Sequence, residues 1–273
     1  MTDVYYRADY AEVAAVVEGG EARMLETEDA LFPVIVRNAG RDVTNPYGYG
    51  GALARDEDAG RRFYAWYGDW CRENGIASSF VRFHPLLRNH VYADPPFELE
   101  RVAGSVAWRL EGDLFQAMHA HHRRAVRKAQ RLGVAVTVTE APTDLAPFVR
   151  LYEQTMDRNE AASFYYFPGQ YWRGLEGREW LVLFEGGGAA TLCFATPPWL
   201  HYQFGASGHE ARSTGASHLL MLCAAQWGQE RGYEQFHLGA GLRGGGGPLL
   251  EWKRRFAPGD LIEQWVGRAQ HET

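Results

Sequence analysis

The chain has 273 residues, of which 46% are hydrophobic and 23% charged, so it can bury one large core or two smaller ones. Its formal net charge of −6 excludes a positive field over the whole molecule, and any contact with nucleic acid must be local. Three widely spaced cysteines, Cys71, Cys193 and Cys223, argue against a disulfide framework and a cysteine zinc site, and favour a reducing compartment.

Hydrophobic spacing in the first half predicts an alternation of helices and strands. The expected helices are residues 9–18, 56–74 and 113–132. The expected strands are residues 23–26, 31–37 and 77–83, with a strand pair in 97–110. An irregular loop is expected at 45–51, where four of seven residues are Gly or Pro. Gly133 follows the third helix, as glycine often does at a helix C-terminus, and the first half is expected to end there.

The second half predicts a similar order of elements. The expected helices are residues 143–159 and 213–231. The expected strands are residues 134–139, 180–184, 189–195, 200–205, 236–238 and 262–268. A loop with six glycines in nine residues, 239–247, precedes a short amphipathic turn at 249–256. The sequence therefore predicts an α+β fold of two intimately packed subdomains, residues 1–133 and 134–273.

Three common signatures are absent from the chain: GxxxxGK[ST], GxSxG and HExxH. A turn of small residues that begins at Arg212 and includes Gly215 and Ser217 does precede an expected helix. Backbone N–H groups at such a helix start favour an anion such as a phosphate. Small residues are also good helix caps, and such a turn on its own is more often an ordinary helix start.

A second candidate is Lys253, which Trp252 and Phe256 flank. Aromatic neighbours would partly desolvate its ammonium, which could then stabilise developing negative charge or hold a diphosphate. A cationic segment is otherwise typical of a solvated face.

A third candidate is a stripe of positive charge on the helix expected at 113–132. Its members recur at i, i+3, i+4 and i+7, which are Arg124, Arg127, Lys128 and Arg131. Such a stripe could contact an RNA backbone, or it could be a solvated helix face. The neighbouring histidines, His119, His121 and His122, reproduce no recognised metal motif, and we expect no metal site.

Four segments in a fixed order resemble the FemAB (FemX-like) aminoacyltransferases of the GNAT superfamily. They are Pro46 to Gly51, Val126 to Val136, Glu230 to Gly241, which contains Gly-Tyr-x-x-Phe-x-Leu-Gly, and Trp252 to Phe256. The Arg212 turn is similar to the pyrophosphate-binding turn of GNAT acetyltransferases. The chain departs from these patterns at Trp252, where Phe is usual, and at Ser217, where Gly or Ala is usual. The resemblance implies two tandem GNAT-like subdomains.

The resemblance also implies roles for individual residues. Arg158 and Lys253 would contact the phosphates of the acceptor, and Tyr202 the acceptor itself. Further substrate-binding candidates are Tyr47, Tyr49 and Arg254, and the segment with His84 and Asn89 also matches the family. The donor would be an aminoacyl-tRNA that contacts the basic stripe. The acceptor would be an amino group on the stem peptide of a UDP-linked or lipid-linked peptidoglycan precursor, and no cofactor would be needed.

Two other functions remain open. An acetyl-CoA-dependent GNAT N-acetyltransferase would use the Arg212 turn, whereas a non-enzymatic carbohydrate- or peptide-binding module would use some of the nine Trp and fourteen Tyr. The first residues lack the features of an export signal, and no apolar run approaches the roughly 18 residues of a membrane-spanning helix. We therefore expect a cytoplasmic enzyme without stable membrane insertion. The sequence leaves open the general base, the amino acid transferred and the oligomeric state.

Overall fold

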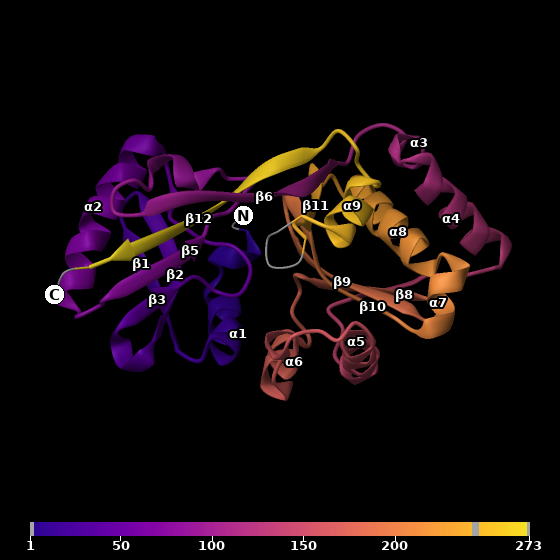
Figure 1. Cartoon of the computed structure of the whole chain (residues 1–273), viewed down its shortest axis with the longest axis horizontal. Coiled ribbons are helices and arrows are strands. Elements are labelled where there is room, and N and C mark those ends of the chain that lie inside the picture. Colours follow the sequence, from indigo (N-terminus) through magenta and orange to yellow (C-terminus); the bar gives the residue numbers. More distant parts are fainter. Residues whose placement is uncertain (1–2, 242–245, 272–273) are drawn as a thin grey trace. The chain divides into compact units, whose positions relative to one another are not determined.

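The computed structural model describes residues 3–241 and 246–271 (Figure 1). Residues 242–245, part of the expected glycine-rich loop, lie outside the described residues. The chain forms two compact units, a central unit of residues 105–261 and a flanking unit of residues 2–104 with 262–273. The sequence placed the division near residue 133 instead. Within the described ranges, no helix combines the length and apolar character that crossing a bilayer requires.

The flanking unit packs helices against a mixed sheet. Its helices and strands are α1 (Ala8–Glu18), β1 (Glu21–Thr27), β2 (Ala30–Arg37), β3 (Asp42–Thr44), β4 (Leu53–Ala54), α2 (Glu57–Glu73), β5 (Ser78–Arg82) and β12 (Leu261–Gln270), with 3-10 turns at Val4–Tyr6, Asn38–Gly40 and Asn89–Tyr92. The strand order is β1-β2-β3-β5-β12. Asp56 caps α2 by accepting the N–H of Ala59 at 2.8 Å. Phe63 and Tyr67, one turn apart on α2, are buried against Phe32 of β2.

The central unit alternates helices with strands, which have the order β11-β10-β9-β8-β7 in the sheet. Its helices and strands are α3 (Leu114–Ala117), α4 (Ala120–Arg131), β7 (Thr137–Glu140), α5 (Ala146–Arg158), α6 (Gly169–Leu175), β8 (Leu181–Gly186), β9 (Ala189–Thr196), β10 (Trp199–Ser207), α7 (His209–Thr214), α8 (Ala216–Glu230), β11 (Gln235–Gly239) and α9 (Pro248–Arg254), with a 3-10 turn at Ser163–Tyr165. Strands β8 to β10 form an antiparallel meander, β7 pairs antiparallel with β8, and α8 connects β10 to its parallel neighbour β11. Helices α8 and α5 cover opposite faces of this sheet (Figure 1).

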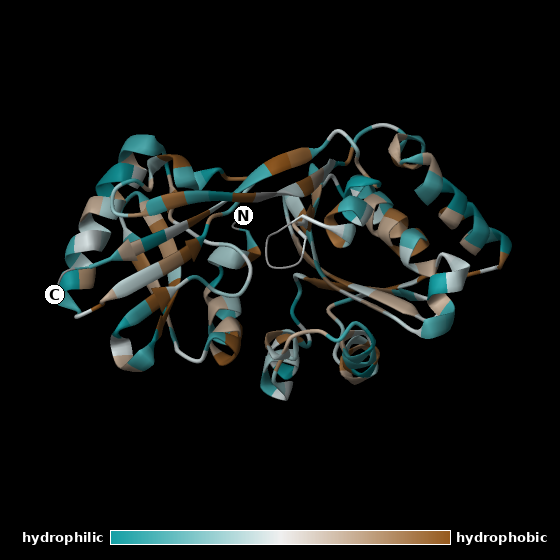
Figure 2. Cartoon of the chain, in the orientation of Figure 1, coloured by the Kyte–Doolittle hydropathy of each residue, from teal (hydrophilic) through white to brown (hydrophobic). Residues whose placement is uncertain are grey.

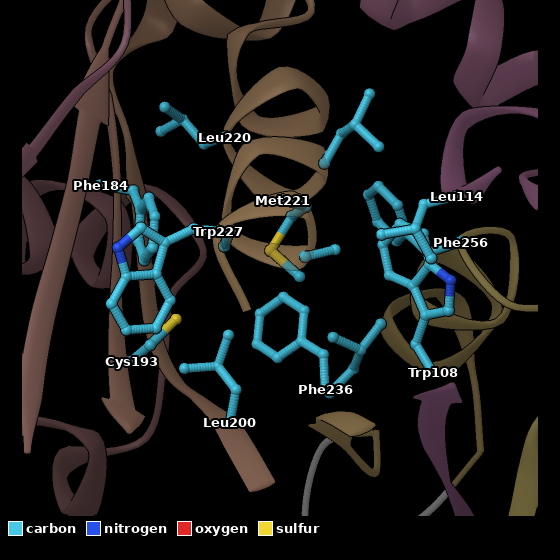
Figure 3. Close-up of a cluster of buried hydrophobic side chains, with 14 of the residues drawn as sticks. Trp108, Leu114, Phe184, Cys193, Leu200, Leu220, Met221, Trp227, Phe236 and Phe256 are labelled. Atoms are coloured by element: carbon cyan, nitrogen blue, oxygen red, sulfur yellow. The ribbon is translucent and has the colours of Figure 1, made fainter. Parts of the chain in front are cut away.

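The core of the central unit lies between α8 and the sheet. Figure 3 shows Leu220, Met221 and Trp227 of α8 facing Cys193 of β9 and Phe236 of β11. All five side chains are at most 9% exposed. Burying such large apolar side chains is the main stabilising contribution, worth about 1.5–3 kcal/mol for each fully buried one. The packing fixes β10, β11 and α9 relative to one another, and these three elements carry the site described below.

Several elements differ from the sequence-based expectation. The helix expected at 113–132 is two helices, because Met118 is extended (ψ 150°) and the His119 side chain caps α4. The helix expected at 213–231 is interrupted by Gly215 in the left-handed region at φ 84°. The expected strand pair at 97–110 is the single strand β6 (Glu98–Arg109), which passes from the flanking unit into the central one. Helix α6 was not expected at all.

Candidate active site

The site begins where two parallel strands stop pairing. Strands β10 and β11 pair at Trp199, Leu200 and His201, although β10 continues to Ser207. Just beyond His201, β10 has a bulge against β9 between Tyr202 and Phe204. A bulge changes the direction in which a side chain points and is common beside functional sites. Here it places Tyr202 at the end of the paired segment.

Lys253 reaches this place from α9. Its side chain is buried, and Nζ donates a hydrogen bond of 2.7 Å to the carbonyl oxygen of Ala240, directly after β11. Nζ also lies 5.3 Å from the centroid of the Tyr202 ring. In the part of the chain that the structure describes, no carboxylate pairs with this ammonium. Burial lowers the pKa of Lys253 to about 7. It is thus a buried cation that an anionic ligand would stabilise.

Tyr202 depends on Gly205 for its position. The Tyr202 hydroxyl lies over the Cα of Gly205, and a Cβ added there would collide with it. Burial raises the pKa of Tyr202, which therefore stays a neutral phenol. The ring lies along the strand and presents a π face to Lys253. The predicted pair, Tyr202 and Lys253, is brought together, whereas the supporting Gly205 was not foreseen.

Arg158 lies at the other end of β10. Thr155 of α5 accepts the N–H of Ser207 at 3.0 Å, which ties the end of α5 to this strand. The Arg158 guanidinium donates to Ser207 Oγ at 3.4 Å, and its Nε is buried without a hydrogen-bond partner. No carboxylate among the described residues pairs with it. An unpaired, partly buried guanidinium is a suitable partner for a phosphate or carboxylate.

These contacts arrange the three predicted residues along one strand. On β10, Ser207, beside Arg158, lies five positions after Tyr202, beside Lys253. At ~3.3 Å per residue this spacing is roughly 16 Å. An elongated ligand with more than one anionic group could span it, whereas a single phosphate could not.

A buried polar chain adjoins the point where pairing ends. His201 Nδ1 lies 3.3 Å from His237 Nδ1, and His237 Nε2 lies 3.1 Å from Ser105 Oγ. All three residues are at most 1% exposed. Two imidazoles and a hydroxyl in series can pass a proton, because each can both donate and accept. Sequence reasoning did not identify this chain, because its members are 132 and 36 residues apart.

The predicted anion-binding turn packs against a neighbouring helix. Gly215 faces α4 so closely that an added Cβ would collide with the carbonyl oxygen of Ala125. The N–H of Ala216 is satisfied by Thr214 Oγ1 at 3.2 Å, and Arg212 points to solvent, while Ser217 is half-buried. The turn joins α7 to α8 and packs on α4, and anion binding by it stays a prediction.

The basic stripe of α4 is exposed. Its four members, Arg124, Arg127, Lys128 and Arg131, all face solvent. The Cζ atom of Arg127 lies 5.2 Å from the centroid of the Phe115 ring. Among the residues described, no acidic side chain pairs with any of the four cations. Figure 2 shows predominantly hydrophilic colouring along this helix.

The remaining candidates lie elsewhere. Arg254 is exposed and pairs with Glu251 at 3.7 Å. Tyr47 and Tyr49 belong to the flanking unit, where burial raises the pKa of Tyr49 to about 12. In the same unit, Asn89 donates to the carbonyls of Gly50 (2.9 Å) and Ala52 (3.1 Å). This segment therefore fixes the aromatic glycine loop, which is a structural role.

The antiparallel meander, the helical crossover to a parallel strand and the buried lysine beside that strand define an acyltransferase of the GNAT fold. A family model described as "Acetyltransferase (GNAT) domain" matches residues 116–254, just over half of the chain. The chain belongs to this family. The match contains all of α4, β10 and α8 and ends just after Lys253. No curated protein sequence matches the chain.

Solved structures share this fold over nearly the whole chain. FemX is 11% identical with a TM-score of 0.65, covering 98% of this chain and 90% of its own. The C-terminal domain of a putative lysylphosphatidylglycerol synthetase from Agrobacterium fabrum is 15% identical with a TM-score of 0.64, covering 97% and 89%. A tandem GNAT protein from the clavulanic acid biosynthesis pathway is 9% identical with a TM-score of 0.53, covering 97% and 94%. The predicted α+β fold with tandem GNAT-like parts is confirmed.

Proposed function

We propose that the protein is an aminoacyltransferase that forms an amide bond between the aminoacyl group of an aminoacyl-tRNA and an amino group of a phosphate-bearing cell-envelope precursor. The acceptor that fits best is the stem peptide of a UDP-linked or lipid-linked peptidoglycan precursor. The resemblance of four sequence segments to FemAB proteins and the fold shared with FemX support this proposal.

The choice of aminoacyl-tRNA over a coenzyme A thioester as the donor rests on the position of the cations that have no acidic partner. Coenzyme A presents a diphosphate, and in the turn that would hold it the N–H of Ala216 already bonds to Thr214 Oγ1 while Gly215 packs on Ala125 of α4. The exposed cations lie instead on α4, at the spacing of a surface that follows a phosphate backbone. A donor that is a polyanion fits this distribution better than a small thioester does.

The site residues have separate proposed roles in binding the acceptor and in the reaction. Arg158 and Lys253 would bind its phosphates, with Lys253 alternatively stabilising the oxyanion of the tetrahedral intermediate. Attack by the free acceptor amine on the aminoacyl ester forms the amide bond and breaks the ester bond, and the proton lost by the amine passes to the ribose oxygen, which leaves as a hydroxyl group. The His201–His237–Ser105 chain is a candidate route for that proton. Aligning two bound substrates supplies a large share of such rate enhancement.

A direct assay distinguishes this function from acetyl transfer. The enzyme is incubated with a UDP-linked muropeptide and either charged tRNA or acetyl-CoA, and the mass of the muropeptide is measured. Addition of an aminoacyl mass from tRNA alone supports the proposal. Addition of an acetyl mass, together with saturable acetyl-CoA binding by calorimetry, would replace it with an N-acetyltransferase, the function that the matched family's description favours.

A further inference from the structure

Three histidines from two helices meet beside Trp252 in the central unit. His121 and His122 are in the first turn of α4, and His218 is in the first turn of α8. The ring centroids of His122 and His218 are 4.5 Å apart, and those of His121 and His218 are 6.4 Å apart. One nitrogen from each of the three residues lies within 4.8 Å of the other two.

His122 is prepared to act as a ligand. Its Nε2 lies 2.9 Å from the carbonyl oxygen of Trp252, which can only accept, so Nε2 carries the proton. The lone pair is therefore on Nδ1, which is buried and has no hydrogen-bond partner. A metal-binding histidine typically donates its other N–H to a carbonyl in this way. An unpartnered buried acceptor would otherwise be unfavourable.

His218 is held by the same tryptophan. Trp252 Nε1 donates to His218 Nε2 at 3.1 Å, while His121 is exposed. Burial lowers the pKa of His122 to about 3 and that of His218 to about 4, so both rings are neutral near pH 7. Neutral imidazoles keep the lone pair that a metal ion needs.

We propose that His121, His122 and His218 form a binding site for a divalent transition metal ion of the zinc class, which would join the first turns of α4 and α8. Bonds of ~2.0–2.1 Å from each nitrogen to Zn²⁺ require the three nitrogens to approach to roughly 3.4 Å. Rotation of the exposed His121 ring and displacement of the Trp252 indole from His218 would supply this movement. Three histidines also leave a fourth position for water.

Charge opposes the ion only weakly. The N-termini of α4 and α8 and the nearby Arg255 all disfavour a cation. Metal–imidazole bonds are much stronger than these screened interactions. The sequence predicted no metal site, because adjacent histidines are an unusual pair and the third is 96 residues from His122.

Zn²⁺ and Co²⁺ titrations of the full chain test the proposal. We expect one ion per chain by calorimetry and visible Co²⁺ bands of a four- or five-coordinate site. His121→Ala, at an exposed position that folding does not need, should weaken binding at least about tenfold. His209→Ala, an exposed histidine outside the cluster, should leave it unchanged. No stoichiometric uptake, or equal affinity in His121→Ala and the parent chain, would overturn the site.

A second variant tests the role of Trp252. Trp252→Phe keeps the backbone carbonyl that orients His122 and removes the indole N–H that competes for His218. We therefore expect it to bind Zn²⁺ at least as tightly as the parent chain. Weaker binding in Trp252→Phe, with unchanged folding by circular dichroism, would contradict the proposed use of His218.

Discussion

At the scale of single residues, Lys253 is the position on which the proposed chemistry depends most. Lys253→Met keeps the length of the side chain but removes the charge, and should lower kcat/KM by roughly two to three orders of magnitude. The melting temperature should not fall, because the variant removes an unpaired buried cation. Arg255→Ala, an ion-paired neighbour, is the control and should retain activity. Steady-state kinetics and a thermal melt of each variant test this prediction. Near-normal turnover in Lys253→Met would show that Lys253 is not part of the site.

The lowered pKa of Lys253 predicts opposite effects of pH on activity and stability. If the charged form binds the acceptor, kcat/KM should fall as pH rises through about 7, where the ammonium loses its proton. The unfolded chain, with a pKa near 10.5, binds more protons than the folded chain across this window. The Lys253 contribution to the free energy of unfolding should therefore rise from pH 7 to 10.5.

The Lys253→Arg variant is the control for this pH dependence. Lys253→Arg keeps its charge throughout, so the inflection in kcat/KM near pH 7 should disappear in that variant, with only partial activity because the geometry changes. Persistence of the inflection would assign the titration to another group.

At the scale of elements, the bulge in β10 positions Tyr202 through Gly205. Gly205→Ala should displace the phenol from Lys253 and lower kcat/KM by about tenfold or more. In a Tyr202→Ala background the same substitution should add little, because the collision no longer exists. A double-mutant cycle on kcat/KM measures this coupling. Additive effects would show that Gly205 acts independently of Tyr202.

Helix α4 provides the test of the donor. Replacing Arg124, Arg127 and Arg131 with Gln should weaken binding of charged tRNA and reduce the slope of log K against log salt by about 0.7–0.9 for each lost phosphate contact. Folding should survive, because all three side chains are exposed. Fluorescence anisotropy at several salt concentrations gives the slope, and an unchanged slope would return the stripe to the role of a solvated face.

The helices and strands also show how much of the fold and of the site could be predicted from the sequence. Periodicity predicted α2 and α5, because each buries one face, and turn-forming segments marked the strands of the meander. It failed where a tertiary contact overrides the pattern, as at Gly215, whose left-handed turn fits against Ala125. The resemblance selected Lys253 and Tyr202, which do meet. It could not predict Gly205 or Ala240, because a bulge and the end of strand pairing depend on register, which the sequence does not display.

At the scale of the whole molecule, the flanking unit depends on a strand that is distant in sequence. Strand β12 pairs with β5 from Val266–Arg82 to Gln270–Ser78 and contributes the buried Gln264, whose Nε2 donates to the Phe83 carbonyl at 2.9 Å. Deleting residues 262–271 should abolish cooperative unfolding of the flanking unit, seen by circular dichroism and limited proteolysis within residues 3–104. Glu263→Ala, exposed on the same strand, should change stability by less than about 0.5 kcal/mol. An intact transition in the truncated chain would contradict this dependence.

The interrupted sequence of the flanking unit has a consequence during synthesis. The central unit is continuous, so it can fold as soon as its residues leave the ribosome. Strand β5 must wait for Arg268, the partner of Phe80, which is 188 residues away. At ~5–20 residues per second, this delay is roughly 10 to 40 s, during which the β5 edge lacks its partner. Nascent chains of this protein should therefore engage chaperones through their first hundred residues, and release from them should follow the emergence of β12.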